Sequence, residues 1–244
     1  MNAIEDTPAA RGWAEAATRF AKPNAIVVVS AHWETEGVRV MSNAHPRTIH
    51  DFAKSFPQEL FDVQYPAHGD PALAHEIVAR LAPFGAQLDD SWGLDHGAWS
   101  VLVHMYSKAD APVVQVSLDA RRGPEAHYEI GRALSALRDQ NILVMATGNI
   151  VHNLRAFFGG DGKPEPWVFA FEEFIEHAIA ADDHAAVACY KLHPDAPQAA
   201  PDWEHFTPLL YALGARREGE QAHLFNRELA SGISMTSVAY GVPA

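Results

Sequence analysis

The chain has 244 residues, of which 48% are hydrophobic and 20% charged, as expected for a globular protein with a large core. Its formal net charge of −13 argues against nucleic acid or an anionic membrane surface as a partner. No apolar run approaches the roughly 20 residues that cross a bilayer. The polar, acidic N-terminus does not resemble a secretory signal. The single cysteine, Cys189, excludes an internal disulfide, so we expect a cytoplasmic protein.

Capping residues, prolines and apolar periodicity predict the elements in chain order. They are a short helix from Asp6-Thr7-Pro8, strands at 25–33 and 37–42, a long loop at 43–69, a helix from Gly69-Asp70-Pro71, a helix at 97–106, a strand at 112–118, a helix from Pro124, a strand at 142–147, helices at about 166–181 and 204–215, and a strand at about 234–240. This alternation predicts a single α/β domain over 1–244, with a central, mainly parallel sheet flanked by helices. The 43–69 loop exceeds usual connection lengths, which favours a role as an active-site wall.

Three of the fourteen histidines stand where an α/β sheet gathers its ligands. His32 and His152 follow apolar runs that we interpret as buried strands, and His205 opens a helical pattern. The carboxyl ends of parallel strands form the ligand-binding edge of such a sheet. Imidazole binds transition metals and exchanges protons near neutral pH, so the three residues favour a metal enzyme.

Other histidines are less informative. His96 lies in Trp92-Gly93-Leu94-Asp95-His96-Gly97-Ala98-Trp99, whose glycines and tryptophans are typical of a shaped pocket wall. His50-Asp51-Phe52 in the long loop resembles it more weakly and reads equally well as a loop-stabilising polar pair. We expect surface positions for His75, His127, His177 and His184, and a packed position for Cys189.

The chain lacks the sequence motifs of several enzyme classes. The chain has no Gly-x-Ser-x-Gly elbow, which argues against a serine hydrolase of that type. It has neither a Walker-type loop nor a dinucleotide fingerprint after a strand. These absences leave a metal enzyme as the leading functional class.

Six separated motifs together resemble the class III extradiol ring-cleavage dioxygenases, in their 4,5-DOPA dioxygenase branch. They are Ser30-Ala31-His32-Trp33-Glu34, Thr48-Ile49-His50-Asp51-Phe52, Gly93 to Trp99, Pro112 to Ser117, Gly148-Asn149-Ile150-Val151-His152-Asn153-Leu154, and Glu204-His205-Phe206-Thr207-Pro208-Leu209-Leu210. The resemblance covers essentially the whole chain.

The resemblance implies a non-haem iron(II) enzyme that opens the ring of a DOPA-like catechol with O2, with zinc sometimes present in isolated bacterial members. It makes His32 and His205 metal ligands and His152 the catalytic acid/base, and it places His96 and His50 at the substrate. A histidine with a pKa near 7 serves as base and then acid in one turnover.

The chain departs from the family at its start. Family members usually begin with a short apolar strand ending in His-Gly-Ser-Pro, whose histidine is a third metal ligand. This sequence opens at Met1-Asn2-Ala3-Ile4, which resembles the residues after that motif. We therefore expect an exposed apolar groove beside the 25–33 strand, and weak metal binding.

Two alternatives use the same residues. One is a zinc-bound hydrolase or isomerase, and the other is a catalytically impaired or partner-binding remnant, suggested by the missing ligand. The physiological catechol, the cleavage position and the oligomeric state stay open.

Overall fold

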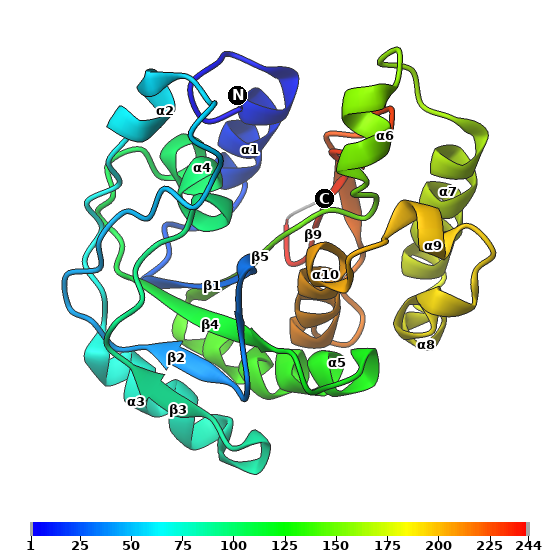
Figure 1. Cartoon of the computed structure of the whole chain (residues 1–244). Coiled ribbons are helices and arrows are strands. Elements are labelled where there is room, and N and C mark those ends of the chain that lie inside the picture. The colour runs from blue at the N-terminus through cyan, green and yellow to red at the C-terminus, as the bar shows by residue number, and fades with distance from the viewer. Residues whose placement is uncertain (1, 243–244) are drawn as a thin grey trace.

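The computed structural model describes residues 2–242, in which helices cover both faces of a five-stranded sheet (Figure 1). The helices are α1 (Pro8–Thr18), α2 (Gln58–Asp62), α3 (Pro71–Arg80), α4 (His96–Met105), α5 (Pro124–Leu134), α6 (Leu154–Gly159), α7 (Pro166–Ala180), α8 (His184–Ala188), α9 (Ala196–Ala199) and α10 (Trp203–Ala215), with 3-10 turns η1 (Ala82–Phe84), η2 (Ser135–Gln140) and η3 (Tyr190–Leu192). The strands are β1 (Ala25–Thr35), β2 (Arg39–Met41), β3 (Gln87–Asp89), β4 (Val113–Asp119), β5 (Ile142–Thr147), β6 (His223–Phe225), β7 (Leu229–Ala230), β8 (Ile233–Ser234) and β9 (Ser237–Ala239).

The central sheet has the strand order β3-β2-β4-β1-β5. Only the β2–β4 pairing is antiparallel, which confirms the predicted mainly parallel sheet. The three-residue strand β3 was not expected, because so short a segment shows no alternation. Capping starts two helices as predicted: Thr7 accepts a hydrogen bond from the Ala10 amide, and Asp70 accepts one from the Leu73 amide.

The apolar run of β1 serves both faces of the sheet because successive side chains point to opposite sides. Val27 and Val29 belong to a core formed with α3, α5 and α10, whereas Ile26 and Val28 belong to one formed with α4 and the long loop. Figure 1 accordingly shows α4 on one side of the sheet and α3 and α5 on the other. A strand buried on both faces explains the continuous run of apolar residues.

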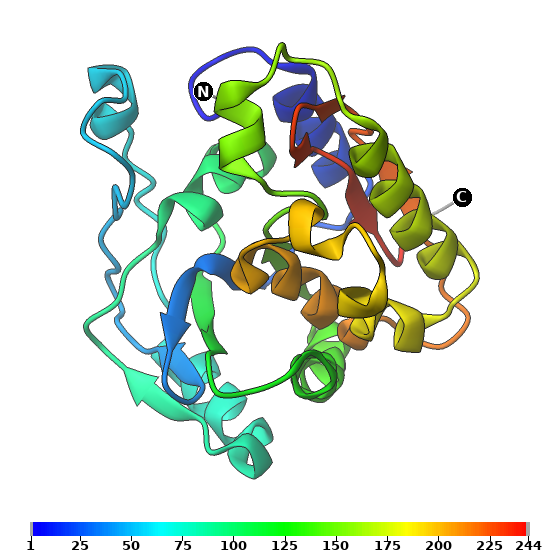
Figure 2. The same ribbon diagram turned by 45° about the vertical axis from the view of Figure 1, so that its right-hand side comes forward.

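The C-terminal part forms a further layer beside the sheet (Figure 2). Helices α7 to α10 share a third apolar core, which includes Phe171, Phe206 and Leu210. The strand expected at 234–240 is instead divided between β8 and β9, which pair antiparallel with β7 and β6 outside the central sheet. Gly232, with φ of +75°, allows the turn from β7 into β8.

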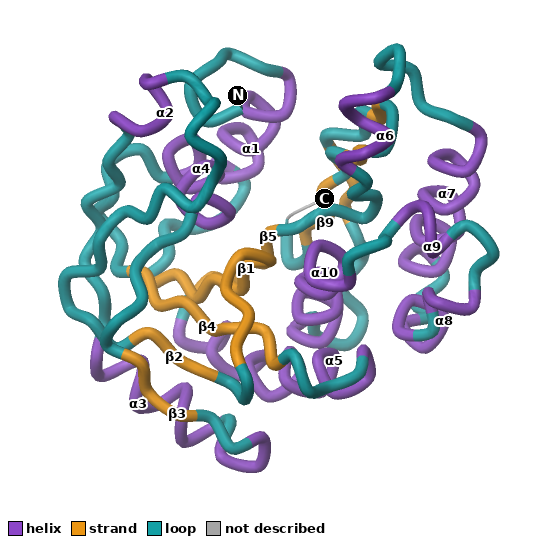
Figure 3. The backbone as a smooth tube through the Cα atoms, in the orientation of Figure 1, coloured by secondary structure: helices purple, strands orange, loops and turns teal. Residues whose placement is uncertain are grey.

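The 43–69 loop winds past the sheet with only α2 as regular structure (Figure 3). It is nevertheless firmly anchored. The Trp99 indole donates to the Ile49 carbonyl at 2.8 Å, and the Tyr65 hydroxyl donates to the Tyr106 carbonyl at 3.0 Å. Tyr65 is buried in the core below α4. These two hydrogen bonds anchor the loop to α4 and to the residue that follows it.

Three predictions of burial are wrong. His127 and His184 are buried, and each has a tyrosine hydroxyl 3.0 Å from its Nδ1 atom: Tyr211 for His127 and Tyr128 for His184. Helical periodicity does not indicate these tyrosine partners, because they lie far away in the sequence. Cys189 is exposed rather than packed, because it lies just beyond the end of α8. His75 and His177 are exposed as expected.

The apolar groove predicted beside the 25–33 strand lies instead along β5. Strand β1 has no free edge, because β4 and β5 pair with its two sides. Among the described residues β5 pairs with β1 alone, and a cavity of about 490 Å³ runs along its other edge. Side chains of α1, α10 and β9 complete the lining. Within residues 2–242, no helix has the length and apolar character needed to cross a membrane.

Candidate metal and proton-transfer site

Strand β1 presents His32 through an irregularity in its pairing. Its register with β4 shifts between Val29 and Glu34, so the intervening residues leave that ladder. Within this segment Ala31 and Trp33 are buried, whereas the His32 side chain is 24% exposed. The shift thus releases His32 from the sheet while both neighbours stay in the core.

A buried polar network fixes the helix that faces His32. Asp95, which is fully buried, caps α4 by accepting from the Ala98 amide at 3.0 Å. Its carboxylate also accepts from the Ser30 hydroxyl at 2.7 Å and the Gln115 amide at 2.8 Å. Ser30 is on β1 and Gln115 on β4, so the network joins both strands to α4. A satisfied buried network of this kind holds its members in one geometry.

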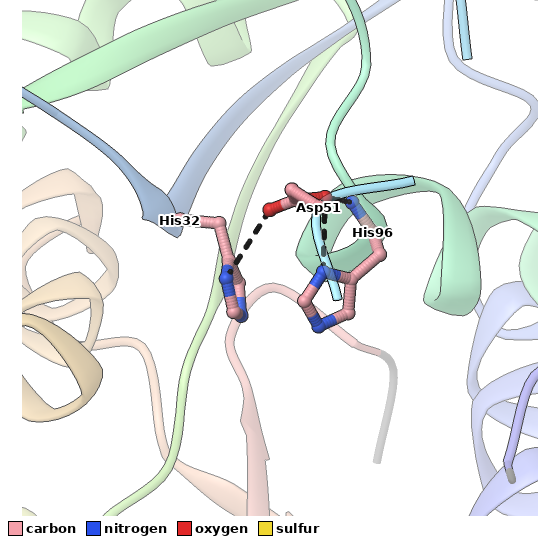
Figure 4. A group of neighbouring side chains, drawn as sticks. All are labelled: His32, Asp51 and His96. Atoms are coloured by element: carbon pink, nitrogen blue, oxygen red, sulfur yellow. Dashed lines mark hydrogen bonds and ion pairs between the residues drawn. The ribbon is translucent and has the colours of Figure 1, made fainter. Parts of the chain in front are cut away.

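Asp51 of the long loop bridges two imidazoles (Figure 4). One carboxylate oxygen lies 3.0 Å from His96 Nδ1 and accepts from the His96 backbone amide at 2.8 Å. The other lies 3.4 Å from His32 Nδ1. Both imidazoles therefore keep Nε2 available on the side away from Asp51. A carboxylate behind a histidine fixes its ring orientation and raises its basicity as a ligand.

The turn after β5 brings His152 to His205. At Gly148 a side chain would place Cβ 2.2 Å from the His205 carbonyl oxygen, so only glycine allows this approach to α10. The Asn149 amide donates to that carbonyl at 2.8 Å, and the His152 amide donates to the Ala199 carbonyl at 2.8 Å. The His152 and His205 rings stack with centroids 3.4 Å apart.

Four imidazoles thus form one continuous row. The ring centroids are 3.9 Å apart for His96 and His32, 5.2 Å for His32 and His205, and 3.4 Å for His205 and His152. The row joins residues from β1, α4, α10 and the turn after β5, which are far apart in the sequence.

Burial keeps three imidazoles of the row neutral, those of His32, His152 and His205. Burial, together with a smaller effect of neighbouring imidazoles, lowers the pKa of His205 to about 2 and that of His152 to about 4. The pKa of His32 is lowered by burial and by His96, against the opposing effect of Asp95 and Asp51. For Asp51, burial acts to raise the pKa, but its contacts with His96 and His32 hold it below the usual range. The expected pKa near 7 for His152 is therefore wrong in the metal-free protein, where its ring is neutral at pH 7.

The row fits a metal ion on the chemistry of its donors. A metal needs neutral imidazoles with free lone pairs. Within residues 2–242, the buried Nδ1 atoms of His152 and His205 have no hydrogen-bond partner. His32, Asp51 and His96 offer a second grouping, with one ligand atom each within 4.8 Å of one another. His32 also neighbours His205, with ring centroids 5.2 Å apart, so it can contribute to either grouping.

His50 lies apart from the row. Its Nε2 is 2.9 Å from the Val63 carbonyl oxygen, and its ring packs near Phe52 and Trp99. Phe52 in turn contacts His96 at 5.3 Å between ring centroids, so one aromatic ring separates His50 from the row. The interpretation of His50 as a loop-stabilising residue matches this contact.

Two acidic residues carry roles that sequence reasoning missed. Asp51 reads as a partner of its neighbour His50, but it pairs with His96 and His32 instead. Asp95 adjoins His96 in the sequence, yet it caps α4 and binds Ser30 and Gln115. The contacts of Asp51 with His32 and of Asp95 with Ser30 and Gln115 do not follow from spacing, because only the tertiary fold brings these residues together.

Comparison with known proteins identifies the class. Residues 4–243 match the family described as the catalytic LigB subunit of aromatic ring-opening dioxygenase. The chain belongs to this family, whose members are metal-dependent ring-cleaving oxidoreductases. This match confirms the resemblance to extradiol dioxygenases that the six sequence motifs indicate.

Named relatives define the branch more closely. The 4,5-DOPA dioxygenase extradiol of Escherichia coli K12 is 45% identical over 88% of this chain and 81% of its own length. The protein of the same name from Beta vulgaris is 37% identical over 87% of this chain and 80% of its own length. The crystal structure of an uncharacterized E. coli K12 protein superposes with a TM-score of 0.83 at 39% identity, covering 96% of this chain and 93% of that one.

Proposed function

We propose that this dioxygenase uses iron(II) and O2 to open the ring of a catechol with a DOPA-like side chain. The observation that carries the proposal is the row of four neighbouring imidazoles at the carboxyl ends of β1 and β5. The substrate class is supported by relatives named 4,5-DOPA dioxygenase extradiol. An exposed lone cysteine is compatible with work in a reducing cytoplasm.

His32 and His205 are the proposed metal ligands. Asp51 turns His32 so that Nε2 faces the row, and the His205 ring stands at 90° to the His32 ring. His205 also stacks on His152, so a metal held by His32 and His205 would lie beside the proposed acid/base. Iron(II), when bound, would supply the electrons for O2 activation and open positions for both catechol oxygens.

His152 is the proposed acid/base. Its Nδ1 is enclosed, so Nε2 is the nitrogen that a catechol hydroxyl can reach. The neutral ring accepts a proton there and can later return it to the opened product. With a pKa lowered to about 4, it is a weak base, which favours rapid return of the proton.

His96 and its neighbours are proposed to bind the substrate ring. The half-buried Phe52 ring meets His96 edge-on, with ring centroids 5.3 Å apart. This flat apolar surface suits an aromatic ligand. His50 would act behind Phe52 rather than touch the substrate directly.

Anaerobic reconstitution with iron(II) tests the function. Addition of DOPA or caffeate in air should consume O2 and give a yellow ring-opened product, whereas hydroquinone, whose hydroxyls are not adjacent, should be inert. A zinc-loaded sample should also be inactive, because zinc cannot supply electrons. Iron-loaded protein that consumes no O2 with any catechol would contradict the proposal. The family match does not favour the zinc hydrolase or isomerase.

We propose further that the groove along β5 accepts an additional strand. Its floor is the edge of β5 that pairs with no strand within residues 2–242, and the cavity reaches Gly148 and His205 at the site end. A free strand edge with apolar walls suits a parallel or antiparallel strand. An N-terminal extension of an apolar strand ending in His-Gly-Ser-Pro should therefore increase metal affinity. Zinc titrations with and without it, and with Ala replacing its histidine, would show this; equal affinities would contradict it.

A further inference from the structure

The 43–69 loop is closed at its base by backbone contacts. The Gly69 amide donates to the Ala44 carbonyl at 3.0 Å, and the Val113 amide of β4 donates to the His68 carbonyl at 2.8 Å. On the opposite side the Asn43 side chain accepts from the His45 amide at 2.8 Å. These bonds fix the backbone of His45 and His68 on the two sides of the loop base.

Two exposed histidines face each other across this base. His45 Nδ1 and His68 Nδ1 lie 3.3 Å apart, and the two rings are tilted by 69°. Both side chains are open to solvent, so a metal ion can reach them without displacing protein atoms. Their contacts do not involve any of the four imidazoles of the row.

This separation suits chelation of one metal ion. Two nitrogens at about 2.0–2.1 Å from a tetrahedral zinc ion stand about 3.3–3.4 Å apart. The observed 3.3 Å therefore requires no movement of the rings toward each other. A formal net charge of −13 further favours accumulation of cations at the surface.

We propose that His45 and His68 form a second, peripheral binding site for a divalent transition metal such as zinc. Water would complete the coordination, because the described residues provide only these two imidazoles at the pair. Imidazole nitrogens select Zn²⁺, Cu²⁺ or Ni²⁺ over Mg²⁺ and Ca²⁺, which prefer oxygen. The site is independent of the proposed catalytic metal.

Occupation of this site would tie the two ends of the loop together. The loop between them carries His50, Asp51 and Phe52, and Asp51 orients two imidazoles of the row. A metal clip that closes a long loop reduces the entropy of its open states. Zinc should therefore protect the loop from proteolysis.

Equilibrium dialysis against a rising series of free Zn²⁺ concentrations tests the site. His45→Ala and His68→Ala should each bind one molar equivalent less than the wild-type chain. His75→Ala is the matched control, because it removes an exposed histidine of α3 that has no imidazole partner, and it should bind like wild type. The comparison is a difference between proteins, so it holds whether or not the catalytic site takes zinc.

Proteolysis provides a second readout. Zinc should slow cleavage within 43–69 in the wild type and the His75→Ala protein, but not in the other two variants. Circular dichroism would establish that all four proteins are folded, and His45→Asn or His68→Gln would replace an alanine variant that is not. Equal zinc stoichiometry and equal cleavage rates in all four proteins would overturn the proposal and leave a hydrogen-bonded imidazole pair.

Discussion

Gly97, in the first turn of α4, should not tolerate replacement by alanine without damage to the site. An added Cβ would lie 2.4 Å from Ser30 Oγ, 2.8 Å from His32 Cδ2 and 3.2 Å from Asp95 Oδ1. Ser30 Oγ and Asp95 Oδ1 cannot move freely, because these two residues are fully buried and hydrogen-bonded to each other, whereas the His32 side chain is partly exposed. The substitution Gly97→Ala therefore pushes His32 away from its position in the row.

The expected cost combines two opposing effects. Replacing glycine by alanine inside a helix stabilises it by about 0.5–1 kcal/mol. Overpacking a dense core costs about 1–3 kcal/mol. We expect a net loss of about 1–2 kcal/mol, which lowers Tm by about 2–8 °C in a chain of this size. Displacement of a ligand by about 1 Å should lower turnover by about 10²-fold.

Gly159→Ala is the matched control. Gly159 also lies in a helix, α6, but an added Cβ there would meet nothing within 4 Å. This variant should keep the wild-type stability or exceed it, with unchanged activity. Urea unfolding, metal content and ring-opening turnover would be measured on both variants. If Gly97→Ala retained wild-type metal content and turnover, the contact between α4 and His32 would not control the site.

Three further changes probe separate parts of the molecule. His152→Ala should keep its metal but lose turnover by about 10²–10⁴-fold, as measured by metal analysis and steady-state kinetics; a loss of metal with unchanged activity per metal would make His152 a ligand. His205→Ala should abolish metal binding, whereas Asp51→Asn should retain metal with lower affinity; the reverse order would assign the ion to His32, Asp51 and His96. Burial lowers the pKa of His127 to about 4, so the folded protein resists its protonation while the unfolded chain binds a proton near pH 6.5. Stability from this group is present above pH 6.5 and falls by about 3 kcal/mol as pH drops to 4, so urea unfolding of His127→Phe should lack that part of the acid dependence.

The sequence was sufficient to predict elements whose signals are local. Asp70 followed by Pro71 starts α3, and the apolar run from Ala25 marks β1, since capping and burial on both faces leave direct patterns. Strand β3 has only three residues and could not be recognised. The division of the 234–240 strand depends on pairing with β6 and β7, which have only three and two residues and so show no alternation.

Site residues show the same division between local and long-range causes. Motifs singled out His32, His152 and His205, and the structure brings these residues together. The Asp51 contacts with His96 and His32 depend on where a long loop returns to the sheet, which its own sequence does not specify. Burial of His127 likewise depends on Tyr211, a residue 84 positions away.

The interrupted pairing of β1 divides the site into a rigid and an adaptable half. After its register shift the strand rejoins β4, where Glu34 pairs with Leu118 and Thr35 with Asp119. The segment that carries His32 is therefore an arch, held by pairing with β4 before and after it. Its backbone is more restricted than that of a residue at a free strand end. The opposite side of the site is built from a loop and from the turn leading to α6. Changes in substrate preference during divergence should accordingly accumulate in those segments, while the arch keeps its geometry.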